Sequence, residues 1–194
     1  MHEVSKSPPV DLASGNLPIV ILISGRGSNM HAIAERAAQG TLPVDVRAVI
    51  SDKADAPGLA IAASIQIPTR ALSPRDFPDR ASYDVALAKL VAGFEPKLVV
   101  LAGFMRILSP SFIATFADRI LNIHPSLLPL YRGLHTHRRC LEAGDQVHGA
   151  SVHFVTEELD GGPLVIQAQL KIRPDDSETT LSARVQPLEH RIYS

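Results

Sequence analysis

Short continuous runs of apolar residues alternate with segments of helical periodicity along most of the chain. Continuous runs such as Pro18–Ser24 and Lys97–Ala102 are typical of strands buried on both faces of a parallel sheet. Asp79–Phe94 instead carries apolar residues at the spacing of one helix face. Alternation of the two patterns predicts an α/β fold, a Rossmann-like doubly wound sheet that is mainly parallel.

After Pro129 the pattern changes to strands in which polar and apolar residues alternate, which predicts an antiparallel C-terminal part. The predicted strands are Pro18–Ser24, Val44–Ser51, Ile67–Arg70, Lys97–Ala102, Ile120–His124, His148–Val155 and Leu164–Ile172. The predicted helices are Met30–Gln39, Pro57–Ala63, Asp79–Phe94, Ser109–Ala117, His137–Glu142 and Glu178–Tyr193.

Length and composition are those of one globular domain, with 194 residues, 45% hydrophobic and 20% charged. A net charge of -1 argues against a nucleic-acid protein that neutralises many phosphates. The single cysteine, Cys140, cannot form an intrachain disulfide, which suits a reducing compartment, and we interpret it as a structural thiol. No apolar run approaches the ~20 residues that span a bilayer, so we expect a cytoplasmic protein without membrane partners.

Residues 1–17 are polar and lack the apolar region of a signal peptide. We interpret them as a disordered or tag-like tail. Residues 18–194 are then a single domain.

A glycine loop, Gly25–Asn29, follows the first predicted strand and precedes a helix. Free N–H groups at a helix N-terminus favour an anion. The third glycine of a dinucleotide fingerprint is replaced by Met30, and no Walker lysine follows, so we favour a single phosphate held by Gly27, Ser28 and Asn29. A plain strand-to-helix turn explains the glycines equally well.

Asn122 and His124 lie at the end of a predicted strand, on one face, with Ile123 on the other. Pro125 ends the strand there. This edge of an open α/β sheet is where ligands bind, although polar residues that cap a turn explain the pattern as well.

Asp160 precedes two glycines in a loop and is a candidate partner for His124. A carboxylate beside an imidazole raises the pKa of the imidazole and orients the ring. Asn122, His124 and Asp160 would then be a polarising amide, a general acid and its tuner, which favours direct transfer to a carbonyl. A turn-forming aspartate is an equal alternative for Asp160.

The spacing of the histidines and the position of Arg80 bear on metal binding and on anionic partners. The histidines between His124 and His153 lack the spacing of a zinc motif, so no metal is expected. Arg80 lies in the first turn of a predicted helix, where the dipole disfavours a cation, which indicates an anionic partner or a solvated side chain.

Several motifs together resemble the glycinamide ribonucleotide formyltransferase family of purine biosynthesis. They are Ile23–Asn29, Leu101–Leu108, Asn122–Pro129, Gly133–His137 and Ser151–Pro163. The resemblance implies the formyltransferase fold and transfer of a formyl group from 10-formyltetrahydrofolate to the amine of phosphoribosylglycinamide. It also implies a monomer or homodimer.

The same resemblance assigns roles to residues of this chain. Asn122, His124 and Asp160 match catalytic positions, and Gly27, Ser28, Asn29, Gln186 and Glu189 match substrate-binding positions. Glu189 would hold the glycinamide amine. The positions that match folate contacts are Arg80, Met105, Arg106, Ile107, Leu108, Asn122, Thr156, Glu157, Glu158, Leu159 and Asp160.

The chain departs from the family pattern near its end. Pro187 removes a helix hydrogen bond and is expected to kink the element that carries Glu189. The last residue, Ser194, precedes a segment that the family usually has, so we expect a shortened C-terminus. Competing hypotheses are a formyltetrahydrofolate deformylase, a methionyl-tRNA formyltransferase, an inactive folate-binding module and, least supported, a nicotinamide oxidoreductase.

Overall fold

The structure is a computed structural model that describes residues 15–194. Residues 1–14 of the predicted tail (residues 1–17) lie outside the described residues. The first strand begins at Leu17, one residue before the predicted start of the domain. The division into a tail and a domain therefore stays a prediction.

Predicted and observed elements agree in type and order, and their ends differ by at most two residues. The strands are β1 (Leu17–Ile23), β2 (Val44–Ser51), β3 (Thr69–Ala71), β4 (Leu98–Leu101), β5 (Ile120–His124), β6 (Val147–Phe154) and β7 (Leu164–Lys171). The helices are α1 (Ser28–Ala38), α2 (Pro57–Ser64), α3 (Arg80–Ala92), α4 (Pro110–Thr115), α5 (Thr136–Ala143) and α6 (Glu178–Tyr193), with a 3-10 turn, η1 (Pro74–Asp76), inside a predicted loop.

One sheet carries the fold, in the order β3-β2-β1-β4-β5-β6-β7. The neighbours from β3 to β5 pair in parallel, whereas β6 and β7 pair antiparallel. The predicted doubly wound sheet with an antiparallel C-terminal part is confirmed. From β1 the strands are added toward one edge of the sheet as far as β3, and from β4 onward they are added toward the other edge. The point between β1 and β4 where this order reverses leaves a crevice at the carboxyl ends of the strands.

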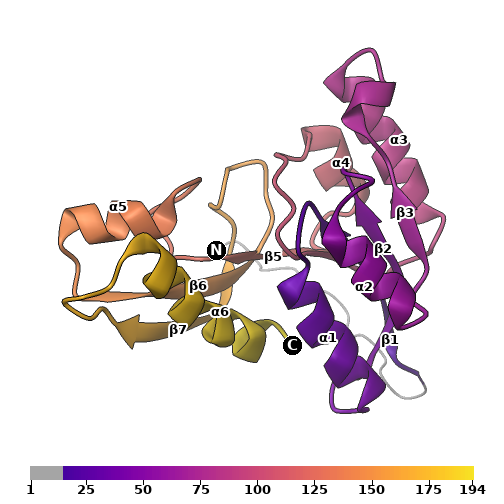
Figure 1. The fold of residues 1–194 in the computed structure, drawn as a ribbon. Helices are drawn as coiled ribbons and strands as arrows, with labels where there is room; N and C mark the ends of the chain where they lie inside the picture. The colour runs from indigo at the N-terminus through magenta and orange to yellow at the C-terminus, as the bar shows by residue number, and fades with distance from the viewer. Residues whose placement is uncertain (1–14) are drawn as a thin grey trace, which may run out of the picture.

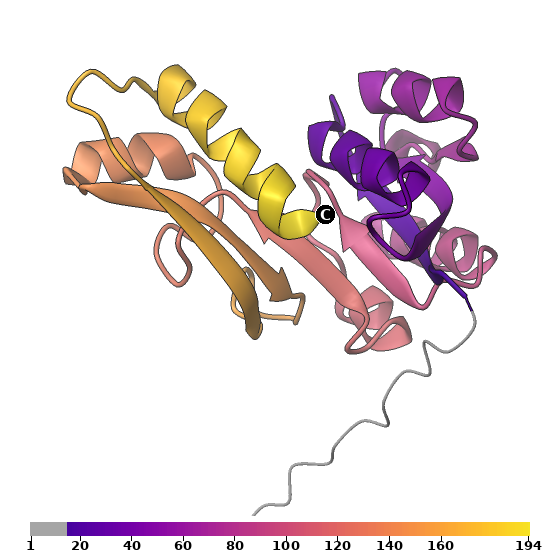
Figure 2. The same cartoon turned by 90° about the horizontal axis from the view of Figure 1, so that it is seen from below.

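Helices cover both faces of the sheet (Figure 1). In Figure 2, α1 and α6 lie on the same side, and α6 crosses β6 and β7 with its C-terminal end near α1. The strands in the middle are therefore buried on both faces, which explains the continuous apolar runs in the sequence.

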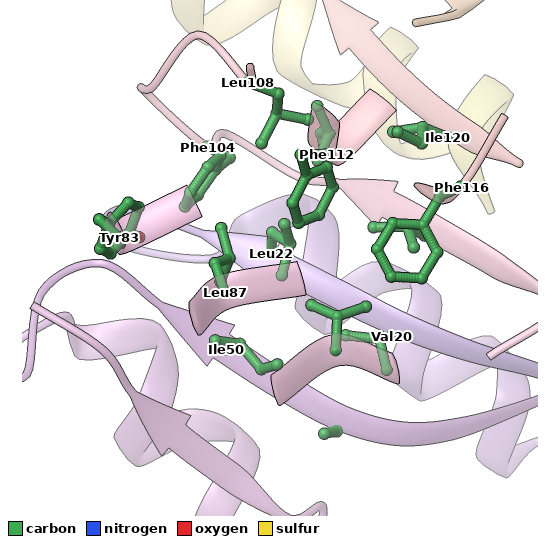
Figure 3. Close-up of a cluster of buried hydrophobic side chains, with 14 residues drawn as sticks. Val20, Leu22, Ile50, Tyr83, Leu87, Phe104, Leu108, Phe112, Phe116 and Ile120 are labelled. Carbon is green, nitrogen blue, oxygen red and sulfur yellow. The ribbon is translucent and has the colours of Figure 1, made fainter. Parts of the chain in front are cut away.

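Alternate residues of β1 supply two separate cores. Val20 and Leu22 belong to the cluster under α3 and α4 that Figure 3 shows, with Tyr83, Phe104 and Phe112 among its members. Ile19, Ile21 and Ile23 face the opposite side and pack with residues of α1 and α2. Burial of these side chains stabilises the sheet by roughly 1.5–3 kcal/mol each.

The same alternation fixes the orientation of β5. Ile120 belongs to the cluster under α4, whereas Ile123 packs with Leu181 and Val185 of α6. Asn122 and His124 therefore lie on the face of Ile120, as predicted from the spacing. They extend past the cover of α4, toward the loops that follow β5 and β6.

Candidate active site

The antiparallel pairing of β5 with β6 places a second histidine opposite Asn122. The register pairs Asn122 with His153 and His124 with Ser151. The amide Nδ2 of Asn122 lies 3.1 Å from Nε2 of His153, whose Nδ1 lies 2.9 Å from the carbonyl oxygen of Phe154. His153 donates from Nδ1 to that carbonyl oxygen, and its Nε2 lies against the Asn122 amide. This contact orients the Asn122 amide and leaves its second N–H available.

His124 is buried, with 6% of its surface exposed, between two acceptors. Its Nε2 lies 3.0 Å from the carbonyl oxygen of Tyr131, and its Nδ1 lies 3.5 Å from Oδ2 of Asp160. Both nitrogens face oxygen atoms, so to direct an N–H at a substrate the ring has to give up one contact. The contact with Asp160 is the longer of the two.

Burial decides the pKa of His124. Loss of solvent lowers this pKa, and the carbonyl of Tyr131 and the charge of Asp160 only partly oppose it. The net pKa is below its usual value. Asp160 raises this pKa as expected, but burial of the imidazole, which the sequence does not reveal, lowers the pKa by more.

Asp160 is fixed by the loop between β6 and β7. Its backbone is left-handed, with φ of 48°, and its Oδ2 accepts a hydrogen bond of 2.9 Å from the Gly133 N–H. The other oxygen, Oδ1, lies 3.6 Å from Nε2 of His153. Burial raises the pKa of Asp160, but the contacts with His153, Gly133 and His124 outweigh burial and hold the pKa below its usual value. The carboxylate therefore stays charged between two histidines.

Two glycines allow this loop to turn. A Cβ on Gly162 would lie 1.9 Å from the carbonyl oxygen of Phe154, so no side chain fits there. Arg132 forms an ion pair with Glu158, which ties the loop after β5 to the loop after β6. The prediction that Asp160 lies beside His124 depends on these two loops meeting, and the structure brings them together.

The glycine loop ends in an open helix N-terminus. Gly27 precedes α1 with φ of 72°, and a Cβ there would lie 3.0 Å from Cα of Gly58 and 3.1 Å from Met30. No side chain caps the first turn of α1. Its N–H groups are therefore open to an anion, as expected for a phosphate site.

Helix α6 reaches this loop from the other end of the chain. Gln186 donates a 2.9 Å hydrogen bond to Oγ of Ser28, and Asn29 donates a 2.7 Å hydrogen bond to Oε2 of Glu189. The predicted substrate residues of the two segments are thus in contact. Burial raises the pKa of Glu189, and the Asn29 contact only partly opposes this shift.

The loop after β4 and the loop after β6 enclose a cavity of about 100 Å³ beside Asn122. Phe104 and Leu108 are buried in the core, whereas Met105 and Ile107 are exposed. The lining residues are Leu101, Phe104, Arg106, Ile107, Leu108, Ile113, Asn122, His153, Val155, Thr156, Glu157, Leu159 and Asp160. Most of the predicted folate positions are therefore brought together here.

Three predicted folate positions lie outside this lining. Met105 donates its N–H to Oγ of Ser24 over 2.9 Å, and Glu158 pairs with Arg132. Arg80 donates a 2.6 Å hydrogen bond to the carbonyl oxygen of Ile107, and its Nε lies 3.6 Å from the buried Asp84. Arg80 thus has an anionic partner inside the chain, and it supports the loop that lines the cavity.

Among residues 15–194 there is no group of three or more His, Cys, Asp or Glu side chains placed to hold a metal ion. Within the same range, no helix has the length and apolar character needed to cross a membrane.

His153, Tyr131 and Gly133 are contacts that the sequence did not assign. The pairing of β5 with β6 sets His153 opposite Asn122, and local spacing alone does not reveal that pairing. The carbonyl of Tyr131 and the N–H of Gly133 are backbone groups, for which side-chain identity gives no signal.

The Asn122 amide and the buried His124 imidazole at the end of β5 meet the Asp160 carboxylate from the loop after β6, and α1 has an uncapped N-terminus. This fold and these groups are those of the formyl transferase class. The family model for formyl transferase matches residues 17–194. The phosphoribosylglycinamide formyltransferase of Escherichia coli (strain K12) is 54% identical over 175 residues, which are 90% of this chain and 82% of that protein. The chain therefore belongs to the phosphoribosylglycinamide formyltransferase family.

Solved structures of this family share the fold. The phosphoribosylglycinamide formyltransferase of Coxiella burnetii, in complex with CHES, aligns with a TM-score of 0.87 at 51% identity, over 92% of this chain and 83% of that one. Glycinamide ribonucleotide transformylase 1 of Symbiobacterium toebii aligns with a TM-score of 0.91 at 40% identity, over 97% of this chain and 89% of that one.

Proposed function

We propose that this chain transfers a formyl group from 10-formyltetrahydrofolate to the amine of 5-phosphoribosylglycinamide in de novo purine synthesis. The products are formylglycinamide ribonucleotide and tetrahydrofolate. The proposal rests on the contacts at the end of β5 in a chain of this family: His124 lies against Asp160, and Asn122 lies beside them with its amide held by His153. We also propose a cytoplasmic location, in keeping with the buried free thiol of Cys140.

The substrate is proposed to span the distance from α1 to β5. Its phosphate binds the free N–H groups that follow Gly27, and its amine end lies toward Glu189, whose Oε2 already accepts from Asn29. The folate ring occupies the cavity lined by Arg106 to Leu108 and by the loop that ends at Asp160.

The reaction is a direct transfer. The neutral amine attacks the formyl carbon and forms a C–N bond, and the carbonyl oxygen becomes an oxyanion. The free N–H of Asn122 stabilises that charge, and His124 supplies a second N–H when it leaves Asp160. Collapse breaks the bond from the formyl carbon to the folate nitrogen, and a proton passes from the amine to that nitrogen.

His124 is proposed to be charged only within the reaction, because it takes the proton that the attacking amine releases and gives that proton to the folate nitrogen when the intermediate collapses. Burial holds the pKa of the free imidazole low, whereas the oxyanion and Asp160 both favour the charged form. The stabilising charge is therefore largest in the transition state, which is the requirement for catalysis.

A formyl transfer assay tests this proposal. We expect loss of the formyl group of 10-formyltetrahydrofolate to depend on added phosphoribosylglycinamide, with one formylglycinamide ribonucleotide formed per tetrahydrofolate. Equal loss in its absence would identify a deformylase, and folate binding without any loss would identify an inactive binding module.

A further inference from the structure

The carbonyl oxygen of Tyr131 decides which nitrogen of the neutral His124 ring carries the proton. It lies 3.0 Å from Nε2, a normal hydrogen-bond length, and because a carbonyl can only accept, Nε2 donates. Nδ1 lies 3.5 Å from Oδ2 of Asp160, which is longer than an N–H···O hydrogen bond. The proton of the neutral ring is therefore on Nε2, and Nδ1 keeps its lone pair.

A lone pair on Nδ1 suits the proposed reaction. The attacking amine releases a proton, Nδ1 takes it, and the Asp160 carboxylate stabilises the resulting imidazolium. When the intermediate collapses, Nδ1 gives the proton to the folate nitrogen, and the ring is neutral again. The hydrogen bond from Nε2 to Tyr131 is kept throughout. The opposite tautomer of His124 would present an N–H to the amine and could not accept its proton.

The side chain of Tyr131 holds this carbonyl in place. The backbone of Tyr131 is left-handed, with φ of 56°, a conformation that residues with a Cβ adopt only where surrounding contacts hold it. Its hydroxyl donates a 2.6 Å hydrogen bond to Oδ2 of Asp145. This contact raises the pKa of Tyr131 to about 12, so the phenol stays a donor at neutral pH.

Asp145 belongs to the body of the fold and not to the loop after β5. It follows Gly144, the left-handed C-cap of α5, and lies just before β6. Arg139 of α5 adds a second connection to the same loop. Its guanidinium lies over the Tyr131 ring, 5.4 Å from the centre, and it donates a 2.7 Å hydrogen bond to the carbonyl oxygen of Arg132. The position of the Tyr131 carbonyl is thus set from α5 and the turn that follows it.

We propose that Tyr131 and Asp145 are positioning residues for formyl transfer. Their phenol–carboxylate contact holds the Tyr131 carbonyl against Nε2 of His124, so that Nδ1 is the nitrogen that accepts the proton. Both residues act through His124 and not on the substrates. The effect on turnover rests on the proposed function, whereas the place of the ring proton is a property of the free protein.

The first test locates the ring proton by ¹⁵N NMR of the full chain labelled at histidine. It is made at about pH 8, where a histidine with an ordinary pKa of about 6.5 is neutral. The signals of His124, assigned by their loss in His124→Gln, should show the widely separated shifts of one tautomer, protonated at Nε2. Tyr131→Phe removes only the hydroxyl, and in this variant the two shifts should move toward each other as both tautomers become populated.

The second test measures turnover. Tyr131→Phe should lower kcat by about 10- to 100-fold, because a displaced group loses its alignment with the reacting atoms. The KM for both substrates should stay within about twofold, since no binding contact is removed. Asp145→Asn keeps an acceptor for the phenol and should lose less. The double variant should lose no more than Tyr131→Phe alone, because both changes act on one contact.

Tyr193→Phe is the matched control, since its hydroxyl also donates to backbone carbonyls, those of Leu101 and Leu121. It should lower the thermal midpoint but keep the wild-type kcat and the wild-type shifts of His124. A wild-type ring protonated at Nδ1, unchanged shifts in Tyr131→Phe, or the same shift change in the control would each overturn the inference. Absence of formyl transfer by the wild-type protein would count against the proposed function, and the NMR result would still decide where the proton lies.

Discussion

At the scale of single residues, opposing effects act on His124. Burial disfavours its charged form, whereas the Tyr131 carbonyl and Asp160 favour it. Asn122 differs, because an amide carries no charge to desolvate and needs only an orientation, which His153 supplies. We therefore expect Asn122 to donate to the oxyanion throughout the reaction, and His124 to do so only as charge develops.

The first prediction concerns the side chains of His124 and Asp160. His124→Ala and Asp160→Ala should each reduce turnover by about 10²–10⁴-fold, because each removes charge stabilisation near the reacting carbon. Steady-state formyl transfer measures the effect, and circular dichroism checks that the variants fold. Near-normal turnover in both variants would exclude the proposed roles. His135→Ala is a control for removal of an imidazole in the same loop region.

At the scale of elements, α6 binds distant parts of the sheet together. Its N-terminal part packs on β7, and Gln186 and Glu189 contact the first turn of α1. The Tyr193 hydroxyl donates to the carbonyl oxygens of Leu101 and Leu121. The helix is continuous from Glu178 to Tyr193 despite Pro187. Glu189, two residues beyond the proline, accepts a hydrogen bond from Asn29.

Pro187 still leaves the carbonyl oxygen of Ala183 without its helix partner. Pro187→Ala should therefore raise the free energy of unfolding by about 1–3 kcal/mol, as measured by urea denaturation. The KM for phosphoribosylglycinamide should stay within about twofold, because the contacts of Gln186 and Glu189 already exist.

Pro78→Ala, in the exposed loop before α3, makes the same substitution outside a helix. It should lower stability slightly, by less than about 1 kcal/mol, since it only increases the entropy of the unfolded chain. A similar gain at both positions would rule out the helix-specific explanation.

At the scale of the whole molecule, a histidine pair whose β6 member, His148, is buried links stability to pH. Nδ1 of His137 in α5 lies 3.0 Å from Nε2 of His148 in β6. Burial, followed by the charge of His137, lowers the pKa of His148 to about 4. His148 is 1% exposed. The folded protein therefore binds its proton only at low pH, whereas the unfolded chain binds it below about 6.5.

The difference between the folded and unfolded pKa of His148 sets the direction in which stability changes with pH. His148 adds stability above pH 6.5, and this contribution is lost as the pH falls toward 4, because only the unfolded state gains the proton in that window. Between pH 7 and pH 4, wild-type protein should lose about 3 kcal/mol more unfolding free energy than His148→Gln. Urea titrations at several pH values measure the loss. The exposed His31→Gln variant should follow the wild-type curve, and parallel curves for His148→Gln would refute the linkage.

Local rules predicted most of the elements and part of the site. Apolar runs identified the buried strands, and the spacing in β5 placed Asn122 and His124 on one face. The third strand, expected at Ile67–Arg70, is Thr69–Ala71, because pairing with β2 sets its limits. The proximity of Asp160 and His124 agreed with the motif resemblance, although 36 positions of sequence separate them.

The sequence by itself determined the order of strands and helices, the face on which each strand residue lies and the family, because these depend on local periodicity and residue identity. Only the tertiary structure decided the low pKa of His124 and the contact of His153 with Asn122. Each depends on solvent exclusion or on strand pairing between segments far apart in the chain. The energy of a charge follows from all the atoms that surround it, and those atoms are assembled only by the fold.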